Sequence, residues 1–211
     1  MYCLPVARGS VAAWIRRYEE RDLAAVYDVC VRTADGGGDA RGMYRSDDLM
    51  PDLFAGPYLF LEPDFAFVLD DGDRAVGYVV GTPDTAAFAR AYRDSWIPRL
   101  ADRYPVPPSP AVTPDDEMLT VHYRPERMLW PELSSYPAHL HIDLLPPFQQ
   151  AGYGRRLMET FFAAAARAGA AGVHLVVMAG NAPALGFYDR LGFTRLPVDD
   201  PDPVVYLGRK L

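Results

Sequence analysis

A glycine-containing turn in front of a predicted helix has the residues needed to hold an anion. Residues 149–156 read Gln-Gln-Ala-Gly-Tyr-Gly-Arg-Arg and lie between a predicted strand and a long predicted helix. The first turn of a helix has backbone N–H groups without partners and carries the positive end of the helix dipole. Gly152 and Gly154 lack the Cβ atoms that would keep an anion away from these groups, and Arg155 and Arg156 add positive charge. This combination suits a pyrophosphate.

Other interpretations of the same turn must be weighed. A plain tight turn also explains two glycines between a strand and a helix. A dinucleotide-binding fold would need the third glycine of G-x-G-x-x-G, where Leu157 stands. That fingerprint usually opens its domain, whereas this turn follows residue 148. The Walker A pattern is missing from the turn as well.

A second motif follows the next predicted strand. Residues 181–193 read Asn-Ala-Pro-Ala-Leu-Gly-Phe-Tyr-Asp-Arg-Leu-Gly-Phe. Asn181 is suited to cap a helix, and Tyr188 lies two turns along that helix. For an isolated tyrosine, packing against the sheet explains the position as well as a chemical role does.

Together the two motifs resemble the GNAT superfamily of N-acetyltransferases over about residues 138–211. The matching residues are Gln149, Gly152, Gly154, Asn181, Ala184 and Tyr188, with Phe-Tyr-x-x-Leu-Gly-Phe at 187–193. The resemblance implies an α/β (α+β) fold of the GNAT type. In this fold helices flank a mixed central β-sheet whose two parallel strands, here 138–145 and 173–178, splay apart at the coenzyme site. We expect one such domain over residues 1–211.

Most of the chain is also similar to the acetyltransferase-like C-terminal domain of eukaryotic protein O-GlcNAcases. The similar segments are residues 25–30, 56–58, 61–69 and 77–84. Those domains are regarded as pseudo-acetyltransferases with a degraded coenzyme-binding loop, whereas this chain keeps residues 149–154 intact. The intact loop and Tyr188 therefore favour an active acetyltransferase of the stand-alone type, with a non-catalytic acetyl-CoA-binding or protein-interaction module as the alternative.

The GNAT resemblance implies acetyl-CoA as co-substrate, with no metal, and direct attack of a neutral amine on the thioester. It assigns coenzyme binding to Ile142, Asp143, Leu144, Gln149, Gln150, Ala151, Gly152, Tyr153, Gly154, Arg155, Asn181 and Tyr188. The backbone of 142–144 would hold the pantetheine, and residues 150–155 the pyrophosphate. Tyr188, near the sulfur, would protonate the leaving thiolate, an effect worth roughly 10² to 10⁴ in rate.

The general base is left open between two residues. Some family members carry a carboxylate on the strand before Asn181, but residues 173–178 supply none. Asp143 and His141, on the polar face of the preceding strand, are the remaining candidates, and we take Asp143 as the catalytic one. A structural role explains either residue at least as well. His174 is expected to be a structural strand residue.

In the C-terminal half the predicted elements alternate between strands and helices. Strands are predicted at 14–18, 65–69, 74–81, 119–123, 138–145, 173–178 and 204–207, and helices at 22–33, 84–103, 153–168 and 182–191. Asp22 and Asp84 are predicted N-caps. Residues 35–39 and the proline-rich 104–117 are predicted loops, and 40–63 a short helix and loop with exposed aromatics.

Composition limits the partners. The net charge of -7 and the pI of about 5 argue against nucleic acid. No apolar run approaches the ~20 residues that span a bilayer, and we see no signal peptide, so we expect a cytoplasmic protein. Cys3 and Cys30 are too few for a disulfide framework. The acceptor is expected to be a small-molecule amine or a protein amino group, and acidic residues in 35–64 would favour a cationic one. A homodimer is compatible with the sequence.

Overall fold

The described part of the chain folds around one mixed sheet. The computed structural model describes residues 13–201 and 203–211, so Cys3 lies outside the described residues. Within them, seven strands pair in the order β1-β2-β3-β4-β5-β7-β6. Their bounds are β1 Trp14–Arg17, β2 Phe67–Asp70, β3 Ala75–Thr82, β4 Ala138–Leu144, β5 Gly172–Met178, β6 Thr194–Arg195 and β7 Val204–Lys210. The α/β (α+β) prediction is confirmed.

The centre of the sheet is open where β4 and β5 meet. These two parallel strands pair only at Ala138↔Val173 and His139↔His174. Beyond this point β4 continues alongside β3 as far as Leu144, while β5 pairs with β7 over its whole length. The predicted splay of the two parallel strands is therefore confirmed, and it leaves one side of β4 unpaired from Leu140 onward.

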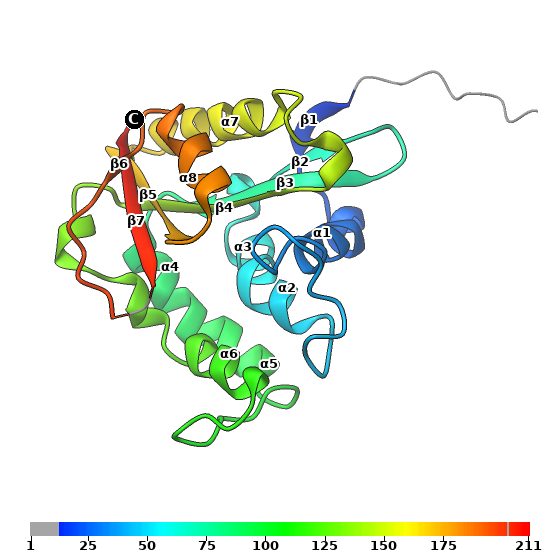
Figure 1. Cartoon of the computed structure of the whole chain (residues 1–211), viewed down its shortest axis with the longest axis vertical. Helices are drawn as coiled ribbons and strands as arrows, with labels where there is room; N and C mark the ends of the chain where they lie inside the picture. The colour runs from blue at the N-terminus through cyan, green and yellow to red at the C-terminus, as the bar shows by residue number, and fades with distance from the viewer. Residues whose placement is uncertain (1–12, 202) are drawn as a thin grey trace, which may run out of the picture.

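Helices cover both faces of the sheet. Helix α7, Tyr153–Arg167, lies over one face, and α1 Leu23–Val31, α2 Leu49–Phe54 and α3 Gly56–Leu61 lie beyond the other (Figure 1). The apolar stripe of α7 supplies Leu157, Met158 and Phe161, which are almost completely buried. Burying such side chains is the main favourable term in folding. Helix α8, Ala182–Asp189, follows β5 and lies beside the sheet opening.

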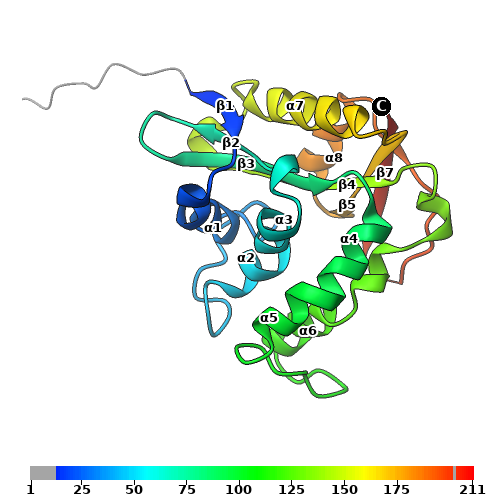
Figure 2. The same cartoon turned by 180° about the vertical axis from the view of Figure 1, so that it is seen from behind.

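A helical arm extends away from the sheet, as both views show (Figure 1, Figure 2). It runs through α4 Thr85–Ala91, a π-helical turn at Tyr92–Trp96 and α5 Ile97–Leu100, and α6 Pro114–His122 packs alongside. The Asp84 side chain accepts a hydrogen bond from the Ala87 N–H at 2.9 Å, so the predicted cap is confirmed. Among the described residues no helix is long and apolar enough to cross a membrane.

One prediction about this region was wrong. Residues 119–123 were predicted as a strand but lie in or directly after α6. Thr113 precedes the first helical residue, Pro114, and forms a capping box with Asp116, and these local signals outweigh the short apolar run. The aromatics of 40–63 were predicted to be exposed; Phe60 is 49% exposed, whereas Tyr58 is buried against Phe88. Strand β6 was not predicted, because two residues give no periodicity.

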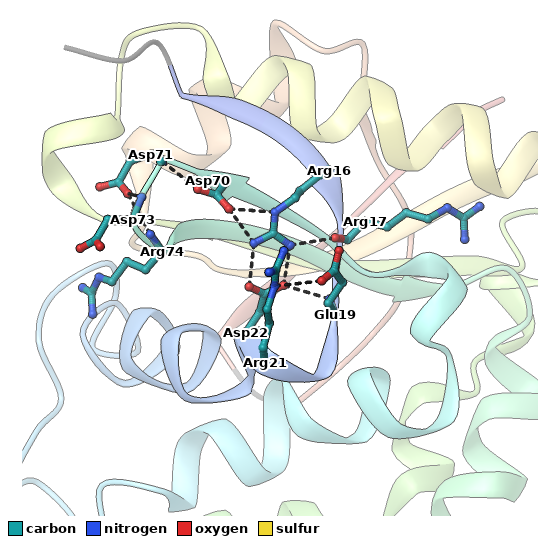
Figure 3. A network of polar contacts seen from close by, with 10 residues as sticks. Arg16, Arg17, Glu19, Arg21, Asp22, Asp70, Asp71, Asp73 and Arg74 are labelled. Atoms are coloured by element: carbon teal, nitrogen blue, oxygen red, sulfur yellow. Dashed lines mark hydrogen bonds and ion pairs between the residues drawn. The ribbon is translucent and has the colours of Figure 1, made fainter. Parts of the chain in front are cut away.

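Asp22 does not cap helix α1, contrary to the prediction. Its carboxylate instead accepts two hydrogen bonds from Arg16, at 2.6 and 2.7 Å, and one from the Glu19 N–H (Figure 3). Arg16 also reaches Asp70 on β2 with two nitrogens, at 2.8 and 2.6 Å. This Arg16 cluster (Arg16, Asp22, Asp70) ties the first strand to the second and to the start of α1.

Candidate active site

Three elements that carry the two sequence motifs meet at the sheet opening. A Cβ placed on Gly154 would lie 3.3 Å from the Phe187 ring and 3.8 Å from Leu144 Cδ1, so the start of α7 approaches both α8 and the end of β4. Gln149 Nε2 donates to the Leu144 carbonyl at 2.8 Å, and Arg155 donates to the Arg190 carbonyl at 3.1 Å. The structure thus brings together residues that are more than 30 positions apart.

The start of α7 forms a cradle of backbone N–H groups. Gly152 has φ +84° and Gln150 has φ +59°, so the chain turns through the left-handed region twice before the helix begins. Among the described residues, none accepts a hydrogen bond from the N–H groups of residues 150–155. A Cβ on Gly152 would meet nothing within 4 Å, which shows that the space beside it is open. Such a turn at a helix N-terminus fits a diphosphate.

Asp143 is a carboxylate without a counter-ion. It lies on β4 opposite Tyr78 of β3, and its Oδ2 accepts a hydrogen bond from the Tyr78 hydroxyl at 2.5 Å. No ion pair to it is formed by the described residues. Burial raises the pKa of Asp143 to about 7, against the opposing effect of the Tyr78 hydrogen bond. A carboxyl group with this pKa can take up and release protons near neutral pH.

Tyr188 lies on α8, within the electrostatic reach of Asp143. Its ring packs edge-on against Phe187 and Phe193, with centroids 5.2 and 5.5 Å away. Burial, and secondly the charge of Asp143, raise the pKa of Tyr188, so its hydroxyl stays protonated at neutral pH. Asn181 caps α8 as predicted, because its Oδ1 accepts from the Ala184 N–H at 3.1 Å.

The three strand histidines differ in their surroundings. His139 is held by the hydroxyls of Tyr58 and Thr85 at 2.7 and 2.8 Å, and His174 Nδ1 pairs with the Tyr136 carbonyl at 2.7 Å, as expected of structural residues. His141 is half-buried against the rings of Phe54 and Tyr58, and burial lowers its pKa to about 4. Near neutral pH, His141 is therefore a much weaker base than Asp143.

The sequence could not show which way the Glu62 and Asp64 carboxylates point. In the structure each of them pairs with a residue other than Asp143. Glu62 accepts from the Thr82 hydroxyl at 2.9 Å, and Asp64 is exposed and paired with Arg17 at 2.8 Å. In the acidic stretch 35–64, Asp39 pairs with Arg41 and Asp48 with Arg103. Among the described residues, no group of three or more His, Cys, Asp or Glu side chains could hold a metal ion.

Sequence reasoning missed Tyr78. The residue sits in a run of buried apolar residues along β3, so it reads as one more core aromatic. Its only signal was a hydroxyl in a fully buried strand, since a buried tyrosine usually hydrogen-bonds. Its partner becomes known only from the β3–β4 register.

Comparison with known proteins agrees with this geometry. Residues 118–193 match the acetyltransferase (GNAT) family. The chain is 28% identical to the protein O-GlcNAcase of Rattus norvegicus over 98% of its own length, and it spans only 23% of that relative. The crystal structure of SsHAT superposes with a TM-score of 0.90 at 53% identity, covering 94% of this chain and 98% of that one.

A more distant structure shares the fold alone. The putative acetyltransferase yncA of Salmonella typhimurium, solved with its cofactor acetyl-CoA, has a TM-score of 0.54 at 13% identity over 95% of this chain and 94% of its own. The sequence match and the structural match thus agree with the splayed strands, the α7 cradle and the two linked motifs. The chain belongs to the GNAT family of acetyltransferases.

Proposed function

We propose that this protein is an acyl-CoA N-acyltransferase that transfers acetyl from acetyl-CoA directly to a primary amine. The observation that carries the proposal is the position of the unpaired N–H groups of residues 150–155 beside the sheet opening, where a carboxylate and a phenol also lie. An anion-binding helix start supports a coenzyme carrying a diphosphate. The acid and base nearby support proton transfer during acyl transfer.

The same residues are proposed to hold the coenzyme as the family resemblance implied. The backbone of residues 150–155 would bind the diphosphate, and the unpaired edge of β4 at Ile142, Asp143 and Leu144 would hydrogen-bond the pantetheine arm. Asn181 would lie near that arm, with Gln149 fixing the loop to β4 through the Leu144 carbonyl. Arg155 and Arg156 supply local positive charge in a chain whose net charge is -7.

In the proposed reaction a C–N bond forms as the C–S bond breaks. The amine nitrogen attacks the thioester carbonyl, and Asp143, directly or through water, takes the proton that the nitrogen loses. Tyr188 donates its proton to the departing sulfur. Both residues then exchange protons with solvent and return to their starting states. The pKa of Asp143, about 7, and the raised pKa of Tyr188 match these opposite roles.

The acceptor is proposed to be a small-molecule amine or a protein amino group, in the cytoplasm. The idea that residues 35–64 select a cationic acceptor stays a prediction. Its support is weaker than the sequence suggested, because Asp39 and Asp48 are neutralised by arginines and Asp52 is buried with Arg103 on one oxygen.

Calorimetry and a thiol-release screen test the proposal in sequence. Acetyl-CoA is titrated into the protein. Adenosine, which lacks the diphosphate, is the control that is expected not to bind. Binding heat, together with a rise in melting temperature, is expected because a ligand of the native state stabilises it. Thiol release is then followed across small amines and lysine peptides. No binding at millimolar acetyl-CoA overturns the proposal, and binding without turnover favours a non-catalytic module like the acetyltransferase-like O-GlcNAcase domain.

A further inference from the structure

Tyr78, on the strand next to β4, hydrogen-bonds the carboxylate of Asp143 at the sheet opening. Tyr78 and Asp143 are directly opposite each other in the β3–β4 ladder, so their side chains project from the same face. The Tyr78 side chain is fully buried, and its hydroxyl donates to Asp143 Oδ2 at 2.5 Å. A hydrogen bond to a charged acceptor is among the stronger kinds in proteins.

The environment behind the Tyr78 hydroxyl is closed. On the α1 side Cys30, which is only 4% exposed, lies near the same hydroxyl. Thr33, also near Asp143, donates its own hydroxyl to the Val29 carbonyl at 2.8 Å. Among the described residues, the titratable groups around Asp143 are Tyr78 from β3, Cys30 from α1, Tyr188 from α8 and His141 on the same face of β4.

This arrangement makes Tyr78 a fixed donor. Burial and the charge of Asp143 raise the pKa of Tyr78 well above its ordinary value, so it does not ionise in the working range. The Tyr78 side chain is fully buried, so its hydroxyl has no contact with solvent through which a proton could leave. What it can do is occupy one carboxylate oxygen and thereby fix the plane of the group.

We propose that Tyr78 is a positioning residue, whose hydroxyl orients the Asp143 carboxylate toward the sheet opening and stabilises its ionised, proton-accepting form. This rests on the proposed function, in which Asp143 is the base. It adds a residue from a strand outside both sequence motifs to the reaction. Asp143 and Tyr78 then form a pair in which only Asp143 exchanges protons with the reacting amine.

The Tyr78→Phe variant tests the proposal through its pH profile. Loss of the donor should raise the apparent pKa of the acid limb of kcat by about one unit, since a hydrogen bond to a charged group is worth about one to two pKa units. If the limb moves from about 7 to about 8, kcat at pH 7 falls roughly fivefold and recovers near pH 9. The KM for acetyl-CoA should not change. A purely structural role would lower activity at every pH.

Tyr92→Phe is the matched control. Tyr92 is also buried, and its hydroxyl bonds His122 at 2.8 Å and not Asp143. Its pH profile should equal that of the unaltered protein. Replacing Tyr78 by 3,5-difluorotyrosine, a stronger donor of similar shape, should move the limb in the opposite direction. This second variant decides the question if Tyr78→Phe does not fold.

The Asp143 pKa is also measured without turnover, by carboxyl ¹³C NMR on aspartate-labelled protein, with Asp143→Asn to assign the signal. An upward shift in Tyr78→Phe supports the proposal even if no acceptor is found, in which case only the proposed function fails. An unchanged Asp143 titration in both Tyr78 variants overturns the positioning role, whatever the activity.

Discussion

The Arg16 cluster and Asp143 are in opposite electrostatic states. In the Arg16 cluster, one guanidinium spans Asp22 and Asp70, and hydrogen bonds from Arg16 and from the Glu19 backbone overcome burial and lower the pKa of Asp22 (Figure 3). Asp143 has a phenol in place of a guanidinium, and burial raises its pKa to about 7. The first group holds strands together, and the second is suited to exchange protons.

The two groups make opposite contributions to stability as pH changes. Asp22, with a lowered pKa, stabilises the fold above its unfolded pKa, and this is lost as pH falls through the folded value. Asp143 has a folded pKa above its ordinary value of 3.8, so the native state binds the proton more tightly. Between about pH 4 and pH 7 its contribution to stability therefore falls as pH rises. The raised pKa that would suit Asp143 to accept a proton near neutral pH therefore lowers the stability of the fold.

Of the changes considered, removal of the proposed proton donor, Tyr188, should have the largest effect, and the effect should be on kcat. We expect Tyr188→Phe to lower kcat by about 10² to 10⁴, because the thiolate would then leave without a positioned acid. Acetyl-CoA affinity should hardly change. Steady-state kinetics and calorimetry measure both, and Tyr123→Phe, whose hydroxyl bonds the Tyr104 carbonyl in the arm, is the control. Unchanged turnover in Tyr188→Phe would remove Tyr188 from the mechanism.

On the structural side, Arg16→Met should cost about 3 kcal/mol of unfolding free energy, since it leaves two largely buried carboxylates without their cation. Denaturant melts at pH 7 give the value. Arg17→Met is the matched control: Arg17 pairs with exposed Asp64, so less than about 1 kcal/mol is expected. Equal losses in the two variants would contradict a special role for the Arg16 cluster.

The Asp143→Asn variant tests the contrast between Asp143 and the Arg16 cluster most directly. It should lower kcat by about 10², through loss of the base. It should also raise stability at pH 8 by about 2 kcal/mol, because a buried charge without a cation is removed. Melting curves from pH 4 to 8 should lose the decline that is expected for the unaltered protein. Asp22→Asn should do the reverse and lower stability at neutral pH. A less stable Asp143→Asn protein at pH 8 would refute the electrostatic contrast.

The smallest effect is expected at the cradle. Gly152→Ala places a Cβ on a residue with φ +84°, which costs about 1–2 kcal/mol in the left-handed region. If the loop relaxes to avoid this, acetyl-CoA should bind about tenfold more weakly. Gly169→Ala is matched in strain, with φ +91° and open space, but lies at the other end of α7. It should lower stability and leave coenzyme affinity unchanged; weaker binding there would show a non-local effect.

The parts of the site that could be predicted are those encoded locally. Gly152 before α7 and Asn181 before α8 are signals contained within a few residues: Asn181 caps α8 as predicted, and Gly152 stands in a left-handed turn at the start of α7. The Tyr78–Asp143 pair joins residues 65 positions apart, and only strand register brings them together. Asp22 was misassigned for a similar reason: Arg16 engages it together with Asp70, 54 positions away from Arg16. The residues next to a charged side chain in the sequence do not indicate which distant residue it will pair with in the fold.

The short pairing of β4 with β5 has a consequence for solubility. Beyond His139 the chain has a strand edge in the middle of a sheet, where backbone groups can recruit a foreign strand as readily as at an outer rim. Outer edges are commonly protected by a charged residue placed in the strand, which resists desolvation in an extended intermolecular ladder. Asp143 occupies that position here. We therefore expect the carboxylate proposed to act in acyl transfer also to discourage pairing with a foreign strand at this edge.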